Sequence, residues 1–111
     1  MDPNEFMARN VMGMVEKYEK CYWVEKPLQR IIEIKDWNPK DNIIQAEECL
    51  IRYCKDIDYR WELSGGFFGK NTICKLIPLN NGKEFRGNAD KISYAICKAI
   101  QAAIKGREKE E

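Results

Sequence analysis

Candidate ligand chemistry gathers in a glycine-rich segment at residues 65–71, whose sequence is GGFFGKN. Two adjacent aromatic residues cannot easily both be buried in a short glycine-rich loop, and an exposed aromatic ring can stack on a nucleobase. A lysine in this segment and two arginines in the flanking segments would supply positive charge for phosphate groups. The predicted ligand-binding residues are therefore Arg60, Phe67, Phe68, Lys70 and Arg86. In an alternative interpretation, Phe67 and Phe68 cover an edge of the core or a dimer interface, where aromatic residues are also enriched.

The same segment does not match the phosphate-binding loop of nucleoside triphosphatases. That loop reads GxxxxGK followed by serine or threonine, and it opens a helix. Here the spacing from Gly65 to Gly69 is one residue too short, and Asn71 stands where a hydroxyl residue is required. A strand rather than a helix is expected after it. The segment therefore indicates stacking and charge, not a triphosphatase loop.

Residues for catalysis or metal binding are scarce. The chain has no histidine, the usual base near neutral pH and the commonest metal ligand. Its cysteines are odd in number and have no C-x-x-C spacing, which argues against a disulfide scaffold or a zinc site; they are Cys21, Cys49, Cys54, Cys74 and Cys97. We expect reduced, mostly buried thiols. No carboxylate pair stands out, so we predict a protein that is not an enzyme and has no metal or cofactor.

The length, net charge and hydropathy of the chain limit the kinds of partner that we expect it to bind. A length of 111 residues suits one domain over residues 1–111, and a net charge of +1 argues against a binder of DNA or RNA duplexes. The chain contains no run of about 18 apolar residues, so no membrane-spanning helix is predicted. The acidic start of the chain lacks the features of a secretory signal, so a cytoplasmic location is expected.

The N-terminal half is expected to hold two helices and two strands. Residues 4–19 show apolar side chains near helical spacing, with Asn4 as a possible cap. Short strands are expected at residues 21–24 and 30–35. Asn38 followed by proline predicts the start of a second helix, which should run to about Cys54.

The C-terminal half is expected to hold three strands and a helix. Alternation at residues 58–63 places Tyr59, Trp61 and Leu63 on one face and Arg60 and Glu62 on the other. Strands at residues 72–78 and 84–86 should be joined by a hairpin turn at residues 80–83. An apolar stripe beginning at Ile92 predicts the last helix, capped by Asn88 or Asp90, before a frayed charged tail at residues 105–111.

These elements predict an α+β fold. Hairpin turns imply antiparallel pairing, and amphipathic helices need a surface to cover. We expect one antiparallel sheet of about four strands sandwiched by helices, in the order α-β-β-α-β-β-β-α.

Two segments resemble the phage ABA sandwich domain family. They are residues 37–43, WNPKDNI, and residues 87–90, GNAD, followed by AICKA at residues 95–99. Lys91 and Ile92 depart from the family, which prefers threonine and a small residue there. The resemblance covers nearly the whole chain and implies a small phage or prophage protein in a bacterial host. It also suggests kinship with Thoeris anti-defence sponges, which bind nucleotide signals without cutting them.

Two functional hypotheses follow. In the first, the protein is a non-enzymatic anti-defence protein that sequesters a small nucleotide signal, such as a cyclic ADP-ribose isomer or a cyclic oligonucleotide. Its pocket would lie at an interface if the protein is a homo-oligomer, as we expect. In the alternative, it is an interaction module that inhibits a host protein through its first helix or a sheet edge, or a structural phage accessory protein.

Overall fold

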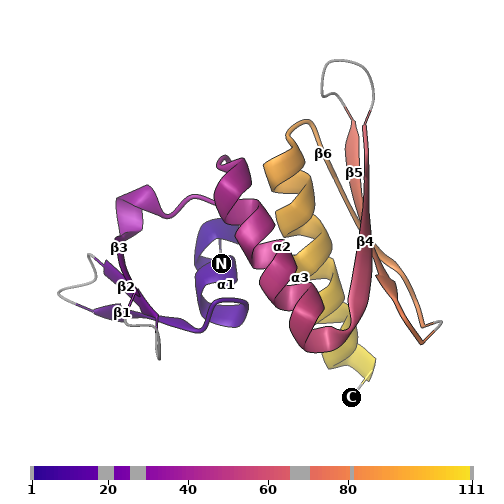
Figure 1. The fold of residues 1–111 in the computed structure, drawn as a ribbon, viewed down its shortest axis with the longest axis horizontal. Helices are drawn as coiled ribbons and strands as arrows, with labels where there is room; N and C mark the ends of the chain where they lie inside the picture. Colours follow the sequence, from indigo (N-terminus) through magenta and orange to yellow (C-terminus); the bar gives the residue numbers. More distant parts are fainter. Residues whose placement is uncertain (1, 18–21, 26–29, 66–70, 81, 111) are drawn as a thin grey trace.

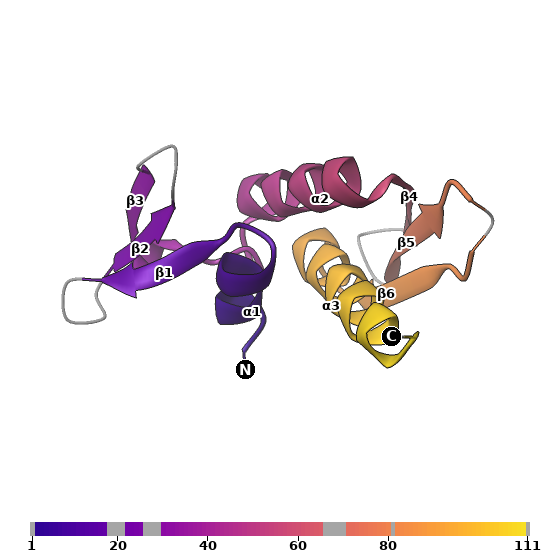
Figure 2. The same ribbon diagram turned by 90° about the horizontal axis from the view of Figure 1, so that it is seen from below.

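The computed structural model describes residues 2–17, 22–25, 30–65, 71–80 and 82–110 of the chain. Two three-stranded antiparallel sheets lie on opposite sides of a layer of three helices (Figures 1 and 2). The α+β class is as expected, but the single sheet of about four strands and the expected order of elements are wrong. The helices lie between two sheets instead of enclosing one.

The extra strand arises where the first helix was expected to continue. Helix α1 spans only Pro3–Asn10, and β1 spans Met14–Lys17. Between them Gly13 takes a left-handed backbone (φ +67°), which turns the chain out of the helix. Asp2, not Asn4, caps α1: its carboxylate accepts bonds from Asn4 N at 2.8 Å and Glu5 N at 3.1 Å.

The N-terminal sheet has the order β1-β2-β3, with β2 at Tyr22–Glu25 and β3 at Arg30–Glu33. One face carries Trp23, which is buried, and the other carries Val15 and Ile31, which are 44% and 54% exposed. A 3-10 turn at Ile34–Asp36 then leads back toward the helices.

Helix α2 begins later than expected, at Ile43, and ends at Ile57. Asn42 caps it, accepting a bond from Gln45 N at 3.1 Å. The side chain of Asn38, the expected cap, instead accepts a bond from Asn4 Nδ2 at 2.9 Å. The segment before α2 is thus bound to the start of α1.

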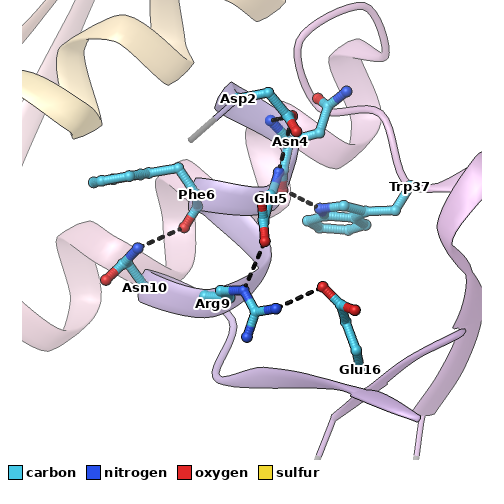
Figure 3. A network of polar contacts seen from close by, with 8 residues as sticks. All are labelled: Asp2, Asn4, Glu5, Phe6, Arg9, Asn10, Glu16 and Trp37. Carbon is cyan, nitrogen blue, oxygen red and sulfur yellow. Dashed lines mark hydrogen bonds and ion pairs between the residues drawn. The ribbon is translucent and has the colours of Figure 1, made fainter. Parts of the chain in front are cut away.

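Trp37 completes this attachment (Figure 3). Its indole Nε1 donates to the Asn4 carbonyl oxygen at 2.8 Å, and its ring is buried. Close by, the Arg9 side chain makes two ion pairs, one with Glu5 of α1 at 3.0 Å and one with Glu16 of β1 at 2.5 Å. Polar contacts therefore hold α1 to both chain segments that lead to the N-terminal sheet.

The C-terminal sheet has the order β4-β5-β6. Its strands are Tyr59–Ser64, Thr72–Pro78 and Phe85–Ala89, so the last extends further than the expected residues 84–86. Asp58, in a left-handed conformation (φ 57°), ends α2 and starts β4. Arg60 and Glu62 lie on the face opposite to Trp61 and Leu63, as predicted. Trp61 and Leu63 pair with the buried Leu76 and Cys74 of β5, so the face of Arg60 and Glu62 is the outer one.

Helix α3 spans Ile92–Glu110 and covers the inner face of β5 and β6 (Figure 2). It therefore continues through residues 105–110, where we expected a frayed tail. The expected alanines, Ala95, Ala99 and Ala103, are fully buried. They let the helix lie so close that a Cβ on Gly87 would stand 2.3 Å from Ala95 O and Ala99 N. No helix in the described part of the chain is long and apolar enough to cross a membrane.

Candidate functional site

The predicted ligand-binding residues divide into two groups. Phe67, Phe68 and Lys70 lie outside the described residues. Arg60 and Arg86 lie on the solvent face of the C-terminal sheet, on its two edge strands with β5 between them. Arg60 pairs at 3.4 Å with Glu62 of the same strand. Arg86 pairs at 2.7 Å with Glu84, which directly precedes β6, so each charge is balanced by a nearby carboxylate. The two arginines do not form a pocket together.

A polar hollow of about 640 Å³ lies instead at the start of α3. Volumes of a few hundred to about 1,000 Å³ are typical of small-ligand sites. The turn before α2, the start of β5, the end of β6 and the first turns of α3 form its walls. Its lining residues are Lys40, Asp41, Asn71, Asn88, Ala89, Asp90, Lys91, Tyr94 and Lys98.

The hollow also joins distant parts of the sequence. Lys40 and Asp41 come from residues 37–43, whereas Asn88, Ala89 and Asp90 come from residues 87–90. These are the two segments on which the resemblance to the phage domain rests. A bond from Ser93 Oγ to the Lys40 carbonyl oxygen, at 2.7 Å, holds the turn against α3.

Positive charge surrounds the ring of Tyr94. The ammonium groups of Lys40 and Lys98 lie 4.9 and 4.6 Å from the ring centroid, within cation–π range. Lys91 donates to Asp41 at 2.7 Å, and this hydrogen bond lowers the pKa of the Asp41 carboxyl. Three lysines and two aspartates leave the lining with one net positive charge.

The backbone adds to this positive potential. The first N–H groups of a helix have no partner within the helix, and the helix dipole makes this end positive. In α3 these groups belong to the first turn, which carries Tyr94 and directly follows Lys91. A small anion in the hollow would meet both the lysine ammonium groups and the positive end of α3.

A second hollow, of about 460 Å³, lies at the opposite end of the C-terminal sheet. Tyr59, Phe85, Lys83 and Arg107 are among its lining residues. The Tyr59 and Phe85 rings meet edge to face at 6.5 Å and are only 9% and 8% exposed. Because little ring surface remains accessible, a base would find less to stack on here than beside Tyr94.

The thiols of the described residues are poor nucleophiles. Cys49, Cys54, Cys74 and Cys97 are free and buried. Burial raises the pKa of Cys54 to about 11 and the pKa values of Cys74 and Cys97 to about 12. These thiols are therefore protonated at neutral pH. Within the described ranges, no three acidic or cysteine side chains gather as they would around a metal ion.

The lysines and the tyrosine of the hollow were missed in the sequence. Lys91, Tyr94 and Lys98 follow one another at i, i+3 and i+7, a spacing that places them on one face of a helix. This spacing was the available signal. Lys40 could not be added to the group, since it reaches the hollow only through the packing of the turn against α3.

No protein-family model matches the chain, and no curated protein matches it either. Its fold is similar to that of a phage protein from Bacillus cereus ATCC 14579, seen in a crystal structure, with a TM-score of 0.65. The similarity covers 95% of this chain and 89% of the other, at 15% identity. The phage ABA sandwich family remains a prediction. The chain therefore shares its fold with a phage protein.

Proposed function

We propose that the protein is a phage-encoded binding protein that captures a small nucleotide in the hollow at the start of α3. The observation that carries the proposal is the pair of ammonium groups, from Lys40 and Lys98, beside the Tyr94 ring, with Lys91 in the same lining. Such a group suits a ligand that has both negative charge and a flat apolar part.

Each part of the hollow has a role in this proposal. The lysines and the start of α3 hold phosphate oxygens, since charge-assisted hydrogen bonds are the stronger ones. The half-buried ring of Tyr94 gives a base or ribose an apolar surface. Asn71 and Asn88 add amide donors and acceptors that can distinguish one base from another.

The phage context suggests why such a protein would hold its ligand intact. The structural neighbour is a phage protein. A phage protein that sequesters a host signalling nucleotide would weaken the defence which that nucleotide triggers. We therefore propose cyclic ADP-ribose isomers and cyclic oligonucleotides as ligands, and an anti-defence role without catalysis.

A retention assay tests the proposal. The protein is mixed with a panel of these nucleotides, unbound ligand is filtered off, and the protein is heated to release what it holds. We expect one nucleotide to be depleted from the filtrate and recovered unchanged. A converted nucleotide would show an enzyme, and no depletion of any nucleotide would rule out the proposal for this panel.

Matched variants locate the site. Lys40→Ala/Lys98→Ala should weaken binding about tenfold or more, because both ammonium groups beside Tyr94 are lost. Lys75→Ala/Arg86→Ala removes the same charge from the outer face of the sheet, where the two residues lie opposite each other on β5 and β6. This variant should leave binding unchanged. Equal losses would show that only overall charge matters. Loss in the second variant alone would place the site on the outer face.

One observation favours a second candidate function, contact with a host protein. Ile44 and Ile51 lie on the same face of α2, and they are 73% and 55% exposed. An apolar helix face of this kind can enter a groove of a partner. Ile44→Lys/Ile51→Lys should then abolish binding to the host protein but keep nucleotide retention.

A further inference from the structure

The outer edge of β4 is open. In the order β4-β5-β6, no strand of the described residues pairs with the other side of β4. Its register with β5 runs without interruption from Tyr59 to Ser64, so no bulge bends the edge away. Residues 60–64 are all exposed, and the strand holds no proline. Its outward N–H and C=O groups can therefore pair with another strand.

The two faces of this edge differ in chemistry. Trp61 and Leu63 lie on the helix side and remain 43% and 44% exposed. Arg60 and Glu62 lie on the outer face, with 61% and 51% of their side chains exposed. A strand that completed this edge would have to offer apolar residues on one face and complementary charges on the other.

A second copy of β4 meets both requirements. In antiparallel pairing with Trp61 opposite the partner's Trp61, Arg60 stands opposite the partner's Glu62, and Tyr59 opposite the partner's Leu63. Opposed side chains are about 4.5–5.5 Å apart, close enough for ion pairs and aromatic contact. Each copy therefore offers the other an opposite charge on the outer face and apolar side chains on the helix side.

The charges also select this register over its neighbours. A shift of one residue would place the apolar face of one copy beside the charged face of the other. A shift of two residues would place Arg60 opposite the partner's Arg60, or Glu62 opposite the partner's Glu62. Like charges directly opposite each other are unfavourable.

We propose that the protein forms a symmetric dimer in which β4 pairs antiparallel with β4 of a second copy, centred on Trp61. The two C-terminal sheets become one six-stranded sheet, with the order β6-β5-β4-β4-β5-β6. This dimer does not depend on the proposed ligand, because the hollow at the start of α3 contains no residue of β4.

A charge-swap series tests the dimer by analytical ultracentrifugation. The unaltered chain should show a concentration-dependent monomer–dimer equilibrium below about 1 mM. Arg60→Glu and Glu62→Arg should each weaken dimerisation about tenfold or more, because like charges then face each other. The double variant Arg60→Glu/Glu62→Arg should restore it. Arg86→Glu, on the edge strand β6, is the matched control and should have no effect, provided that circular dichroism shows each variant folded.

Cross-linking tests the register. In Trp61→Cys, the two new thiols would face each other across the dimer and oxidise to an intermolecular disulfide. In Leu63→Cys, they would stand about 14 Å apart along the strands, four residues at ~3.4 Å each, and should not cross-link. A monomer at every concentration, or a dimer that the single charge reversals do not weaken, would overturn the proposal. Failure of the double variant to restore the dimer, or cross-linking of position 63 but not 61, would overturn the register.

Discussion

The Glu25 carboxylate of β2 accepts a hydrogen bond from Arg52 of α2 at 2.5 Å, although only 1% of its side chain is exposed. Opposite Glu25 in the sheet, Arg30 pairs with Glu48, one helical turn before Arg52. Two ion pairs of opposite orientation thus join the N-terminal sheet to α2. The second oxygen of Glu25, Oε2, is buried and has no hydrogen-bond partner among the residues that the structure describes.

Removing one member of the buried pair should be costly. Arg52→Met leaves the Glu25 carboxylate buried without its partner, so the free energy of unfolding should fall by about 3 kcal/mol or more. Urea titration followed by circular dichroism measures the change. Glu25→Leu/Arg52→Met should recover much of the loss, since no charge is then left buried. Arg86→Met breaks an exposed pair and should leave the midpoint unchanged; an equal shift in both single variants would contradict the prediction.

Gly87→Ala should destabilise the protein through overpacking. The added Cβ would lie 2.3 Å from two backbone atoms of α3, which cannot move aside as a side chain can. We expect a loss of about 3 kcal/mol in thermal or urea unfolding. Gly13→Ala is the comparison: its Cβ meets nothing within 4 Å, so only the left-handed backbone counts against it, about 1 kcal/mol. Similar losses in the two variants would show that α3 can shift away from β6.

Trp37→Phe separates the indole hydrogen bond from ring packing. The variant keeps an aromatic ring but removes the donor to the Asn4 carbonyl oxygen, so stability should fall by about 1–3 kcal/mol. Trp37→Ala, which also empties the buried site, should cost about 3–5 kcal/mol. If Trp37→Phe unfolds at the same urea concentration as the unaltered chain, the hydrogen bond contributes nothing measurable.

The buried thiols predict both reactivity and pH dependence. Burial raises the pKa of Cys54 to about 11 and that of Cys74 to about 12, above the ordinary value of 9.0. In a Cys21→Ser variant, Ellman's reagent at pH 8 should therefore label almost nothing until the protein unfolds.

The same pKa shifts set the sign of the pH effect. Above pH 9 the unfolded chain loses thiol protons that the folded chain keeps. The free energy of unfolding should therefore keep its full value below about pH 8 and fall as the pH rises from 9 toward 12. Melting curves between pH 7 and 10.5 measure this. A melting temperature that stays constant across that range would contradict the prediction.

Most of the strands and helices of the C-terminal half could be predicted from local sequence patterns. The strand at residues 72–78 has the expected bounds, and the stripe of Ala95, Ala99 and Ala103 gave α3 and its buried face. In both elements the period of the apolar residues agrees with the final packing. Sequence reasoning succeeded here because no distant contact overrides the local preference.

In the N-terminal half, distant contacts decide the structure. Met14 and Val15 fit a helical stripe as well as a strand, and Gly13 together with pairing to β2 settles the choice. Asn38 is a good cap by residue type, but Asn4 already occupies its side chain. The hollow at the start of α3 escaped prediction for the same reason, because Lys40 joins Tyr94 only in the folded chain.

The polar contacts of Asn4 have an evolutionary consequence. Residues 14–33, which form the N-terminal sheet, lie between α1 and α2 in the chain, and Asn4 is bonded to the segment where the chain returns from the sheet. Both ends of this segment are thus fastened to the helices, in addition to the ion pairs that Glu25 and Arg30 make with α2. Exposed side chains of this sheet, such as Val15 and Ile31, can then change among descendants of the chain without disturbing the packing of α3 on β5 and β6.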